Sequence, residues 1–414
     1  MSNVLVTGTN SPSLSKSGWI RRQVARLHDG RTGTVPLIIA GMGLNGLGIA
    51  RSIGKAAPWV PIYGFHGVDD LAGRYSRYAS HRYFKNMKVE DLVDEILSFA
   101  ESLNVRPALI VTQENIANEL ASRLEDVSSR VHICFPEGQL YNMLMNKGRF
   151  QSVAESAGLS IPSGVIVGTS EEIEAARFLA APFALKPVQR NRAYECEFKK
   201  AYKVQTFDEL SSLAARILRV VDEVVIQEWV EGADDAIYFC LQYRSAANVT
   251  LASFTGRKIR SWPPRVGGTA SCTAAPDADA ELRKETDRFF EALGVAGFVS
   301  MEYKRDARTG RYMAIEPTVG RTDHQEEVAT LNGVNIPLVG YCDLAGLPLP
   351  ASRAVEAHPV IWRDSVADRL ASRANGSAKM PRGQVVDAVF RYDDPGPALA
   401  WLLGPHRLPF VGRK

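Results

Sequence analysis

Two glutamates, Glu302 and Glu316, are the residues of this chain whose type and spacing best suit joint chemistry. They lie in two runs of alternating polarity, residues 299–304 and 311–316, and this period predicts two β-strands. The segment between the runs ends in Gly310, and a three-residue loop closed by a left-handed glycine is typical of a hairpin. Counting outward from that loop places Glu302 opposite Glu316.

Facing carboxylates need something to offset their repulsion. Like charges opposite each other destabilise a sheet by up to roughly 1 kcal/mol. A divalent cation removes this repulsion, and Mg²⁺ prefers oxygen ligands of this kind. Two glutamates that extend separately into solvent would avoid the repulsion as well. The hairpin by itself therefore leaves a magnesium site and a pair of solvated side chains equally open.

Two lysines stand where they could reach phosphate oxygens. Lys186 ends an apolar strand predicted over residues 183–186, and a loop follows it. Lys147 follows an apolar run and begins a helix predicted over residues 147–157. A lysine ammonium binds phosphate as a compact point charge. A solvated surface lysine is the more common role of either residue taken alone.

The segment 224–232 has the pattern of a buried strand that runs into a polar, glycine-ended link. Such a link presents backbone N–H and C=O groups to a flat heterocycle, and Gln227 adds an amide. A strand end with an ordinary turn fits equally well. Arg321, just past the strand of Glu316, could reach charge that develops in the same cleft. A basic stretch, which could hold an anionic substrate or form a solvated face, contains Arg257, Lys258, Arg260 and Arg265.

The elements that must position these residues alternate between strand and helix. In the first part of the chain, strands are predicted over residues 35–40, 60–65 and 108–112, and helices over 47–57, 89–103 and 116–124. This alternation indicates an α/β fold with a doubly wound parallel sheet. Residues 41–46 match G-x-G-x-x-G between the first strand and helix, which also allows a dinucleotide-binding site. The acidic residue expected after the second strand is missing, because His66 stands there and Asp69 and Asp70 come later.

The same patterns divide the chain into five parts. The first is a polar N-terminal arm with one short helix over residues 19–27, and the last carries a strand over 385–390 and a helix over 397–403. Between them, strands are predicted over 163–167, 236–243 and 249–260, and helices over 170–179 and 278–293. The five parts are residues 1–34, 35–140, 141–225, 226–345 and 346–414.

Composition bounds the class of protein. The chain has 414 residues, 45% hydrophobic content and a net charge of +3, which is ordinary for a globular protein of two or three domains. There is no basic tract interleaved with aromatic residues, so nucleic-acid binding is not indicated. Five scattered cysteines without a C-x-x-C pair favour neither disulfides nor structural zinc. Without an apolar run of 18 residues or a signal-type N-terminus, the chain is expected in the cytoplasm, with no transmembrane segment.

The order of these motifs resembles the ATP-grasp superfamily, over about residues 37–337. Within it, the stretches 300–306, 314–318 and 331–337 are most similar to the carboxylate–amine ligase and carbamoyl phosphate synthetase-like branch. The run Arg74-Tyr-Ser-Arg-Tyr78 is also similar to one in D-aspartate ligase-like relatives. The resemblance implies an α/β fold in which a Rossmann-like (pre-ATP-grasp) N-terminal domain precedes a two-lobed ATP-grasp fold and a C-terminal extension. The small lobe would span residues 141–225 and the large lobe residues 226–345.

The resemblance also implies a role for each motif. Lys147 and Lys186 would contact the ATP phosphates, and Glu302 and Glu316 would bind one or two Mg²⁺ ions. The backbone of Glu228 and Val230 would form the adenine hinge. Gln227 would face the adenine amino group, Trp229 would pack beneath the base, and Asp234 would bind the ribose. The candidates for holding a substrate carboxylate or phosphate during catalysis are Arg257, Lys258 and Arg321.

The family reaction has two steps. A carboxylate attacks the γ-phosphoryl group of ATP and gives an acyl phosphate and ADP, and an amine then displaces phosphate to leave an amide. The expected partners are a small carboxylate and a small amine, and a homodimer is left open. Two alternatives remain: a catalytically weak nucleotide-binding protein and a dinucleotide-dependent oxidoreductase. The first alternative depends on three departures from the family pattern, at Asn146, at the glycine-free loop 190–192 and at Thr318.

Overall fold

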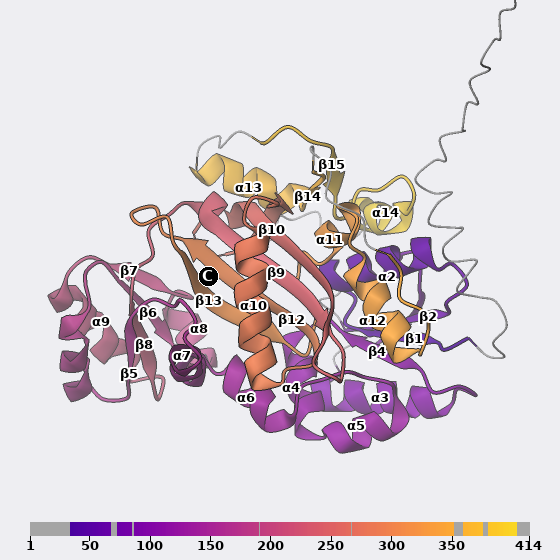
Figure 1. Ribbon diagram of the computed structural model, residues 1–414, viewed down its shortest axis with the longest axis horizontal. Helices are drawn as coiled ribbons and strands as arrows, with labels where there is room; N and C mark the ends of the chain where they lie inside the picture. Colours follow the sequence, from indigo (N-terminus) through magenta and orange to yellow (C-terminus); the bar gives the residue numbers. More distant parts are fainter. Residues whose placement is uncertain are drawn as a thin grey trace, which may run out of the picture.

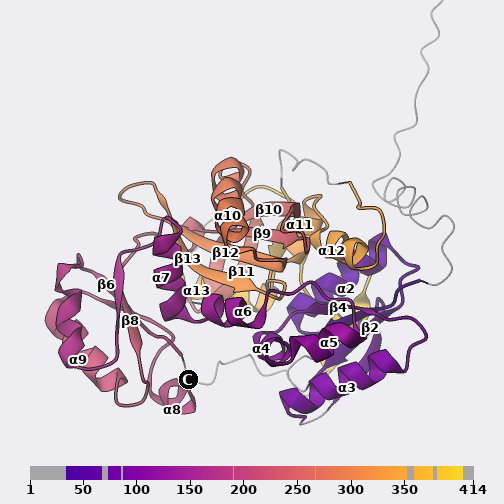
Figure 2. The same ribbon diagram turned by 60° about the horizontal axis from the view of Figure 1, so that its bottom comes forward.

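The computed structural model describes residues 34–67, 73–84, 87–189, 191–265, 267–351, 359–375 and 380–403. The helix predicted over residues 19–27 lies outside these ranges. Three sheets succeed one another across the molecule, with the largest sheet between the other two (Figures 1 and 2). No helix in the described part of the chain is long and apolar enough to cross a bilayer.

The first sheet is parallel, as the alternation of strands and helices predicts. Its strand order is β3-β2-β1-β4, with β1 at Leu37–Ala40, β2 at Ile62–His66, β3 at Ser80–Tyr83 and β4 at Ala108–Val111. Helix α2 (Leu44–Ala56) packs on one face of this sheet. The helices α3 (Val89–Glu101), α4 (Glu114–Ser122) and α5 (Leu124–Arg130) share the core of the other face. Both faces of the sheet are thereby covered at β1 and β4, which explains why these two strands are continuously apolar.

The second sheet has four strands in the order β5-β8-β6-β7, and we call it the small sheet. Its strands are β5 (Gly164–Val167), β8 (Val224–Glu228), β6 (Phe183–Pro187) and β7 (Tyr202–Val204). The nearby helices are α7 (Lys147–Ser156), α8 (Arg192–Glu197) and α9 (Phe207–Ile217), and the helix predicted over 170–179 is the 3₁₀ helix η1 (Glu171–Phe178). The division predicted between residues 225 and 226 falls inside β8, all of which pairs within this sheet.

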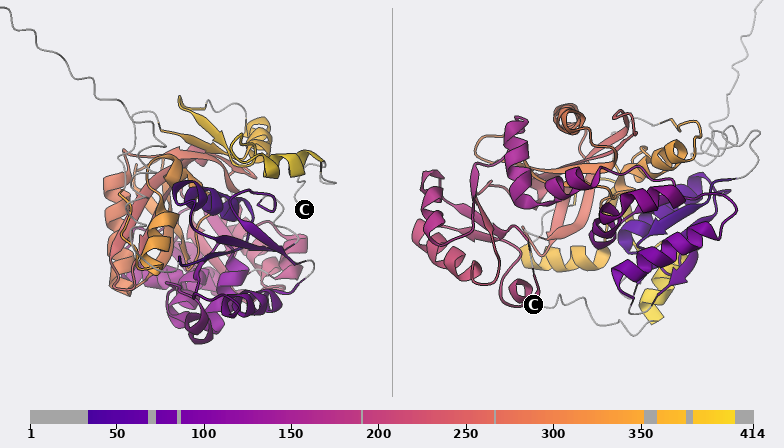
Figure 3. Two further views of the ribbon diagram at one scale, coloured as in Figure 1. Left: turned by 90° about the vertical axis from the view of Figure 1, so that its right-hand side faces the viewer. Right: turned by 90° about the horizontal axis from the view of Figure 1, so that it is seen from below.

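The third sheet, the large sheet, has seven strands in the order β13-β12-β9-β10-β11-β14-β15. Five of them come from the predicted third region: β9 (Ile237–Arg244), β10 (Thr250–Trp262), β11 (Gly268–Ala274), β12 (Gly297–Arg305) and β13 (Tyr312–Val319). Helix α10 (Asp279–Leu293) covers one face, and α13 (Ser365–Asn375) covers the other (Figures 2 and 3). Helix α6 (Gly138–Met145) contacts β13, and α11 (Glu327–Leu331) and α12 (Ile336–Leu344) lie between this sheet and α2.

The C-terminal part joins the large sheet. Strand β14 (Ile361–Arg363) pairs with β11, and β15 (Val385–Asp387) pairs with β14. Helix α14 (Pro395–Leu403) follows, so the strand and helix predicted near the C-terminus are both present. The predicted C-terminal extension is therefore two further strands of the large sheet together with two helices. It lies along the edge of this sheet and reaches the first domain (Figure 3).

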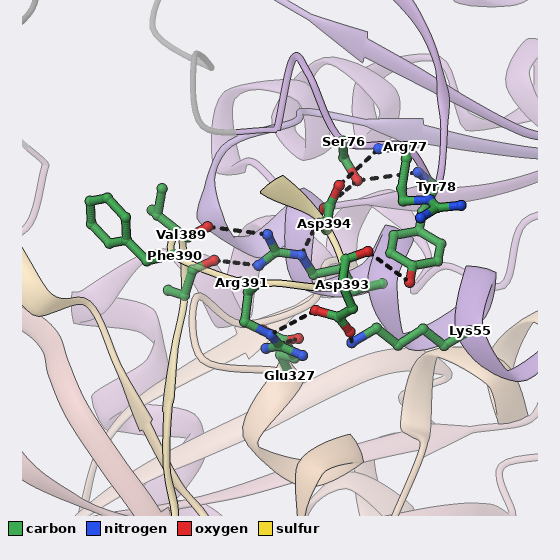
Figure 4. Close-up of polar contacts among 12 residues, drawn as sticks. Lys55, Ser76, Arg77, Tyr78, Glu327, Val389, Phe390, Arg391, Asp393 and Asp394 are labelled. Carbon is green, nitrogen blue, oxygen red and sulfur yellow. Dashed lines mark hydrogen bonds and ion pairs between the residues drawn. The ribbon is translucent and has the colours of Figure 1, made fainter. Parts of the chain in front are cut away.

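A polar cluster fastens the C-terminal part to the first domain (Figure 4). The Asp394 carboxylate is fully buried and accepts hydrogen bonds from the Arg51 guanidinium at 2.9 Å and from the Ser76 hydroxyl at 2.7 Å. The backbone N–H of Arg77 donates to the same carboxylate at 2.9 Å. Asp393 pairs with Lys55 beside it. A buried carboxylate is tolerated only with such partners, so this cluster fixes the junction.

Candidate active site

The predicted glutamate hairpin is confirmed. Strands β12 and β13 are antiparallel neighbours, and Glu302 lies opposite Glu316. The loop differs from the prediction: Arg305 pairs with Tyr312, so the connection is longer than three residues. Ile315 then forms a bulge that restores the register at the glutamates. Partners in an antiparallel pair project from the same face, so both carboxylates lie on the face of the sheet that lines the cleft.

A cleft of about 1780 Å³, counting its open mouth, lies between the small and the large sheet. Ten of the twelve predicted site residues line it. They are Lys147, Lys186, Gln227, Glu228, Trp229, Val230, Lys258, Glu302, Glu316 and Arg321. Residues that are far apart in the sequence and come from both sheets therefore face one space.

Each glutamate of the hairpin faces a lysine. The Lys258 ammonium lies 2.7 Å from the Glu302 carboxylate, and the Lys147 ammonium lies 3.7 Å from the Glu316 carboxylate. Burial alone would lower the pKa of Lys258, but Glu302 raises it above its ordinary value. Burial alone would raise the pKa of Glu316, but lysines that include Lys147 and Lys186 hold it below its ordinary value. These shifts keep Lys258 protonated and Glu316 ionised at neutral pH.

The two phosphate-binding candidates come from adjacent elements. Lys147 is the first residue of α7, whose N-cap Asn146 accepts hydrogen bonds from the backbone N–H groups of Gly148 and Arg149. Asparagine and aspartate cap helices about equally well, so the departure at Asn146 preserves this start of the helix. Lys186 stands on β6, and burial lowers its pKa to about 8, with Glu316 opposing the shift.

Strand β8, which pairs with β6, and the link after it line the cleft on the side of the small sheet. The Gln227 side-chain N–H donates to Gln151 at 2.7 Å, so its oxygen is the atom that can accept a hydrogen bond from a ligand. The Glu228 N–H already donates to the Ser163 carbonyl at 2.9 Å. The Trp229 ring has the Lys304 ammonium 4.7 Å from its centroid, within the range of a cation–π contact. Lys304 was not predicted from the sequence, although it also lines the cleft.

Two predicted site residues do not line the cleft. Asp234 is buried, and its carboxylate accepts hydrogen bonds from the backbone N–H groups of Ser261 and Arg265 at 3.1 and 2.7 Å. It thereby fixes the end of β10. Arg257 precedes Lys258 on the same strand, and successive residues of a strand point to opposite faces. Because Lys258 faces the cleft, Arg257 faces the side covered by α10.

The segment that follows β13, residues 320–326, adds polar groups to the cleft that the sequence analysis did not identify. It contributes Asp323, His324 and Gln325 beside the predicted Arg321. The Ser300 hydroxyl donates to Asp323 at 2.6 Å, and the Arg321 guanidinium lies 3.5 Å from Glu114 of α4. The only local feature of the sequence that marks this segment as part of the site is its position directly after the strand of Glu316. We call it the loop 320–326.

The glycine-rich turn supports this loop. The Asn45 side chain donates to the Thr322 carbonyl at 2.9 Å and accepts from the Thr322 hydroxyl at 3.0 Å. A Cβ at Gly46 would lie 2.1 Å from the Gly41 carbonyl oxygen, so glycine is required by close packing there. The turn thus has a packing role that the dinucleotide interpretation did not include.

The donor set fits a hard divalent cation. Two carboxylates share one face of a hairpin, and Mg²⁺ is usually bound by one or two carboxylates together with substrate phosphates. No group of three histidine, cysteine, aspartate or glutamate side chains in the described ranges is arranged to hold a metal without a further ligand. Thr318 pairs with Ser300, two positions along the strands from the pair Glu302 and Glu316, and it lines the same cleft.

This mixed α/β arrangement is similar in fold to solved structures of the ATP-grasp class. The biotin carboxylase domain of Hydrogenobacter thermophilus 2-oxoglutarate carboxylase, solved as a dimer with MgADP, ADP and bicarbonate, superposes with a TM-score of 0.64. It shares 13% sequence identity and covers 80% of this chain and 74% of its own. N5-carboxyaminoimidazole synthetase from Staphylococcus aureus with ADP gives a TM-score of 0.59 at 14% identity, covering 81% of this chain and 83% of its own.

Two sequence relatives are named as ligases, which agrees with the resemblance stated from the motifs. D-aspartate ligase of Enterococcus faecium (strain Aus0004) is 24% identical over 314 residues, which are 72% of this chain and 74% of the relative. D-alanine–D-alanine ligase of Ectopseudomonas mendocina (strain ymp) is 24% identical over 190 residues, which are 44% of this chain and 58% of the relative. No family model matches the chain.

Proposed function

We propose that this protein is an ATP-dependent ligase that joins a carboxylate to an amine through an acyl phosphate and releases ADP and phosphate. One observation carries this proposal: Glu302 and Glu316 of the large sheet face Lys147 and Lys186 across one cleft. Phosphoryl transfer needs positioning and charge neutralisation rather than covalent participation of the protein. Lysines and carboxylates that converge from two sheets supply both.

The chain's own residues bind ATP in this proposal. Lys147 and Lys186 contact the phosphate oxygens, Gln227 accepts a hydrogen bond from the adenine amino group, and the link at Glu228 and Val230 faces the base. Lys304, which lines the cleft, is the proposed contact for the ribose in place of Asp234, whose carboxylate accepts two backbone N–H groups and does not line the cleft. The small and large sheets then correspond to the small and large lobes, and the first domain to the Rossmann-like domain.

The metal requirement follows from the same geometry. Glu302 and Glu316 would hold Mg²⁺, which would neutralise negative charge on the phosphates. Lys258 and Lys147 hold these carboxylates in place until the metal nucleotide enters. Arg321 then faces the charge that develops on the acyl group, since it lies in the same cleft on the loop 320–326. Closure of the small lobe would exclude water from the acyl phosphate.

We propose that the carboxylate substrate is an amino acid, because both sequence relatives are named for D-amino acids. D-aspartate is the first amino acid to test. Cationic groups on the cleft wall, Lys258 and Arg321, suit a dicarboxylate. The cytoplasm stays the proposed location, and dimerisation stays open.

The test is ATP turnover that depends on a carboxylate. The full chain is incubated with ATP, Mg²⁺, hydroxylamine and each member of a panel of D- and L-amino acids, and both ADP and hydroxamate are measured. Hydroxylamine traps an acyl phosphate, so we expect ADP and hydroxamate in equal amounts with the correct acid. ATP binding, read from the thermal shift with Mg²⁺, without any turnover across the panel would favour the catalytically weak alternative suggested by Thr318.

A further inference from the structure

The amine step of the proposed reaction needs a proton acceptor. At neutral pH an aliphatic amine is mostly protonated, since an α-amino group has a pKa of about 8 and an alkylamine about 10.4. A protonated nitrogen has no electron pair with which to attack. A group that is unprotonated at neutral pH and exposed to the substrate can take up this proton.

The carboxylates of the cleft are poorly suited to this role, because each is already engaged; Glu228, for example, accepts the Ala180 N–H at 3.0 Å. Glu302 pairs with Lys258 at 2.7 Å, and Glu316 faces Lys147 at 3.7 Å. Both are also the proposed magnesium ligands. Asp323 accepts the Ser300 hydroxyl at 2.6 Å, and both Asp323 and Glu114 lie within 4 Å of the Arg321 guanidinium, at 3.9 and 3.5 Å.

His324 meets the requirement. Its side chain is exposed within the cleft, on the same loop as Arg321. Its ring packs edge-to-face on Trp362 of β14, with 5.5 Å between centroids, so the C-terminal part of the chain orients it. Burial is the main cause that lowers the pKa of His324, although the side chain is accessible from the cleft; the nearby Asp364 and Asp323 oppose this shift, and Lys258 and Arg321 add to it. The imidazole is therefore neutral at neutral pH and free to take up a proton.

Hydrogen bonds hold the loop 320–326 on both sides of His324. Thr322 is buried and bonded to Asn45 of α2, and its N–H donates to the Val111 carbonyl of β4 at 3.0 Å. The neighbouring Asp323 N–H donates to the Glu326 carboxyl group at 3.2 Å. A proton acceptor acts efficiently only when its position is fixed before the substrate binds, and these bonds fix the backbone on both sides of His324.

We infer that His324 is the catalytic base that takes a proton from the amine substrate, an inference that rests on the proposed ligase function. The ammonium nitrogen gives one proton to the His324 imidazole, and the freed electron pair forms the C–N bond to the acyl carbon. The C–O bond to phosphate then breaks, and phosphate leaves with the second nitrogen proton as hydrogen phosphate. The imidazolium returns its proton to solvent, which balances charge and atoms.

The test compares two nucleophiles that differ in their need for a base. Hydroxylamine is largely unprotonated at neutral pH, whereas glycinamide is an α-amino compound that is mostly protonated there. With the carboxylate found in the panel, the His324→Gln variant should form hydroxamate at close to the wild-type rate. With glycinamide its kcat should fall by roughly 10²- to 10⁴-fold, the usual contribution of a general base. The deficit should shrink as the pH rises, because free amine then becomes abundant.

The matched control is His132→Asn. His132 lies beside β4 in the first domain, and burial lowers its pKa as well, but it does not line the cleft. We expect this control to behave as wild type with both nucleophiles. Should glycinamide not be accepted, hydroxamate formation at acidic pH, where hydroxylamine is itself protonated, gives the same comparison.

Each outcome decides the question. Equal losses of His324→Gln with both nucleophiles would mean that the ring only supports the loop, and no loss with either would mean that it is not used; both results overturn the inference. A wild-type enzyme that forms neither ADP nor hydroxamate would instead overturn the proposed function, because the first step would then be missing. The two failures are distinguishable because hydroxamate reports the acyl phosphate before any amine is deprotonated.

Discussion

Asn45 and Thr322 are 277 residues apart in the chain and exchange two hydrogen bonds. Asn45 belongs to the glycine-rich turn of the first domain, and Thr322 belongs to the loop that carries Arg321 and His324. The positions of the Arg321 and His324 side chains in the cleft therefore depend on this contact between the first domain and the loop 320–326. The glycine-rich turn, which in isolation suggested dinucleotide binding, serves in this protein to hold a loop of the active site.

The first prediction concerns this contact. Asn45→Ala removes two hydrogen bonds from the buried Thr322 and leaves its hydroxyl and carbonyl only the longer 3.3 Å contacts with Val111 and Arg321, so the free energy of unfolding should fall by about 1–3 kcal/mol. The kcat should fall while the KM for ATP stays nearly constant, because Lys147 and Lys186 lie on other elements. Chemical denaturation and steady-state kinetics measure the two effects. Asn118→Ala, which removes an acceptor from the Tyr141 hydroxyl outside the cleft, is the control. Equal losses of kcat in both variants would contradict the assigned role of Asn45.

The second prediction concerns the hairpin. Glu316→Gln keeps the size of the side chain but removes one of the two charges proposed to hold Mg²⁺. The kcat should fall by roughly 10²- to 10³-fold, as for loss of one charge-stabilising group, and the Mg²⁺ concentration for half-maximal rate should rise. Glu172→Gln, an exposed glutamate of η1, serves as control. An unchanged magnesium dependence in Glu316→Gln would remove the metal assignment.

Much of this hairpin could be predicted from the sequence, because alternating polarity is a local property. The strands and the pairing of Glu302 with Glu316 are as predicted, and Gly310 has the expected left-handed conformation with φ of 73°. The bulge at Ile315 was missed, because an isoleucine within an alternating run has no local mark of a bulge. The predicted pairing is correct because the bulge offsets the longer loop.

The remainder of the site depends on contacts between distant segments, which no local pattern encodes. Asp234 is an acidic residue near the cleft, yet its carboxylate accepts backbone N–H groups from the end of β10 and from the turn that follows it. Trp362 lies in a part of the sequence without a recognisable motif, and only the pairing of β14 with β11 brings it to His324. Arg257 and Lys258 are indistinguishable by type, and the strand period alone could not tell which of them faces the cleft.

The third prediction concerns pH. Burial lowers the pKa of Lys186 from 10.5 to about 8 in the folded protein, so this lysine loses its charge as the pH rises through 8. The kcat/KM for ATP, which reports the free enzyme, should therefore fall above that pH. Lys186→Arg keeps its charge and should keep its kcat/KM at higher pH, relative to its own value at neutral pH. An identical alkaline limb in both proteins would exclude Lys186 as its origin.

The same shift has a consequence for stability. Between pH 8 and 10.5 the unfolded chain holds more protons on Lys186 than the folded chain does, because only the folded pKa is lowered. The contribution of this residue to the free energy of unfolding therefore becomes more favourable as the pH rises through that window. Denaturation of wild type and Lys186→Met at several pH values isolates the contribution as the difference between the two proteins. A difference that does not change with pH would contradict the lowered pKa.

The last prediction compares two neighbouring aspartates that fasten the C-terminal part to the first domain. Asp394 and its partner Arg51 have side chains that are 0% and 1% exposed, whereas the Asp393 side chain is 46% exposed. Removing one partner of a buried ion pair leaves an uncompensated charge, so Asp394→Asn should lower the free energy of unfolding by about 3–5 kcal/mol. Asp393→Asn breaks a partly exposed pair with Lys55 and should cost at most about 1 kcal/mol.

The two variants also separate anchoring from catalysis. Strand β14, which carries Trp362, is connected through β15 to the segment that ends in Asp394, so loosening this anchor should reach His324. The Asp394→Asn variant should therefore lose more activity with glycinamide than with hydroxylamine, in the same direction as His324→Gln. Asp393→Asn should show no such difference. Suppose that Asp394→Asn loses stability but shows no such difference between nucleophiles. The pairing of β14 within the large sheet would then be enough to position Trp362, and the Asp394 anchor would have no effect on His324.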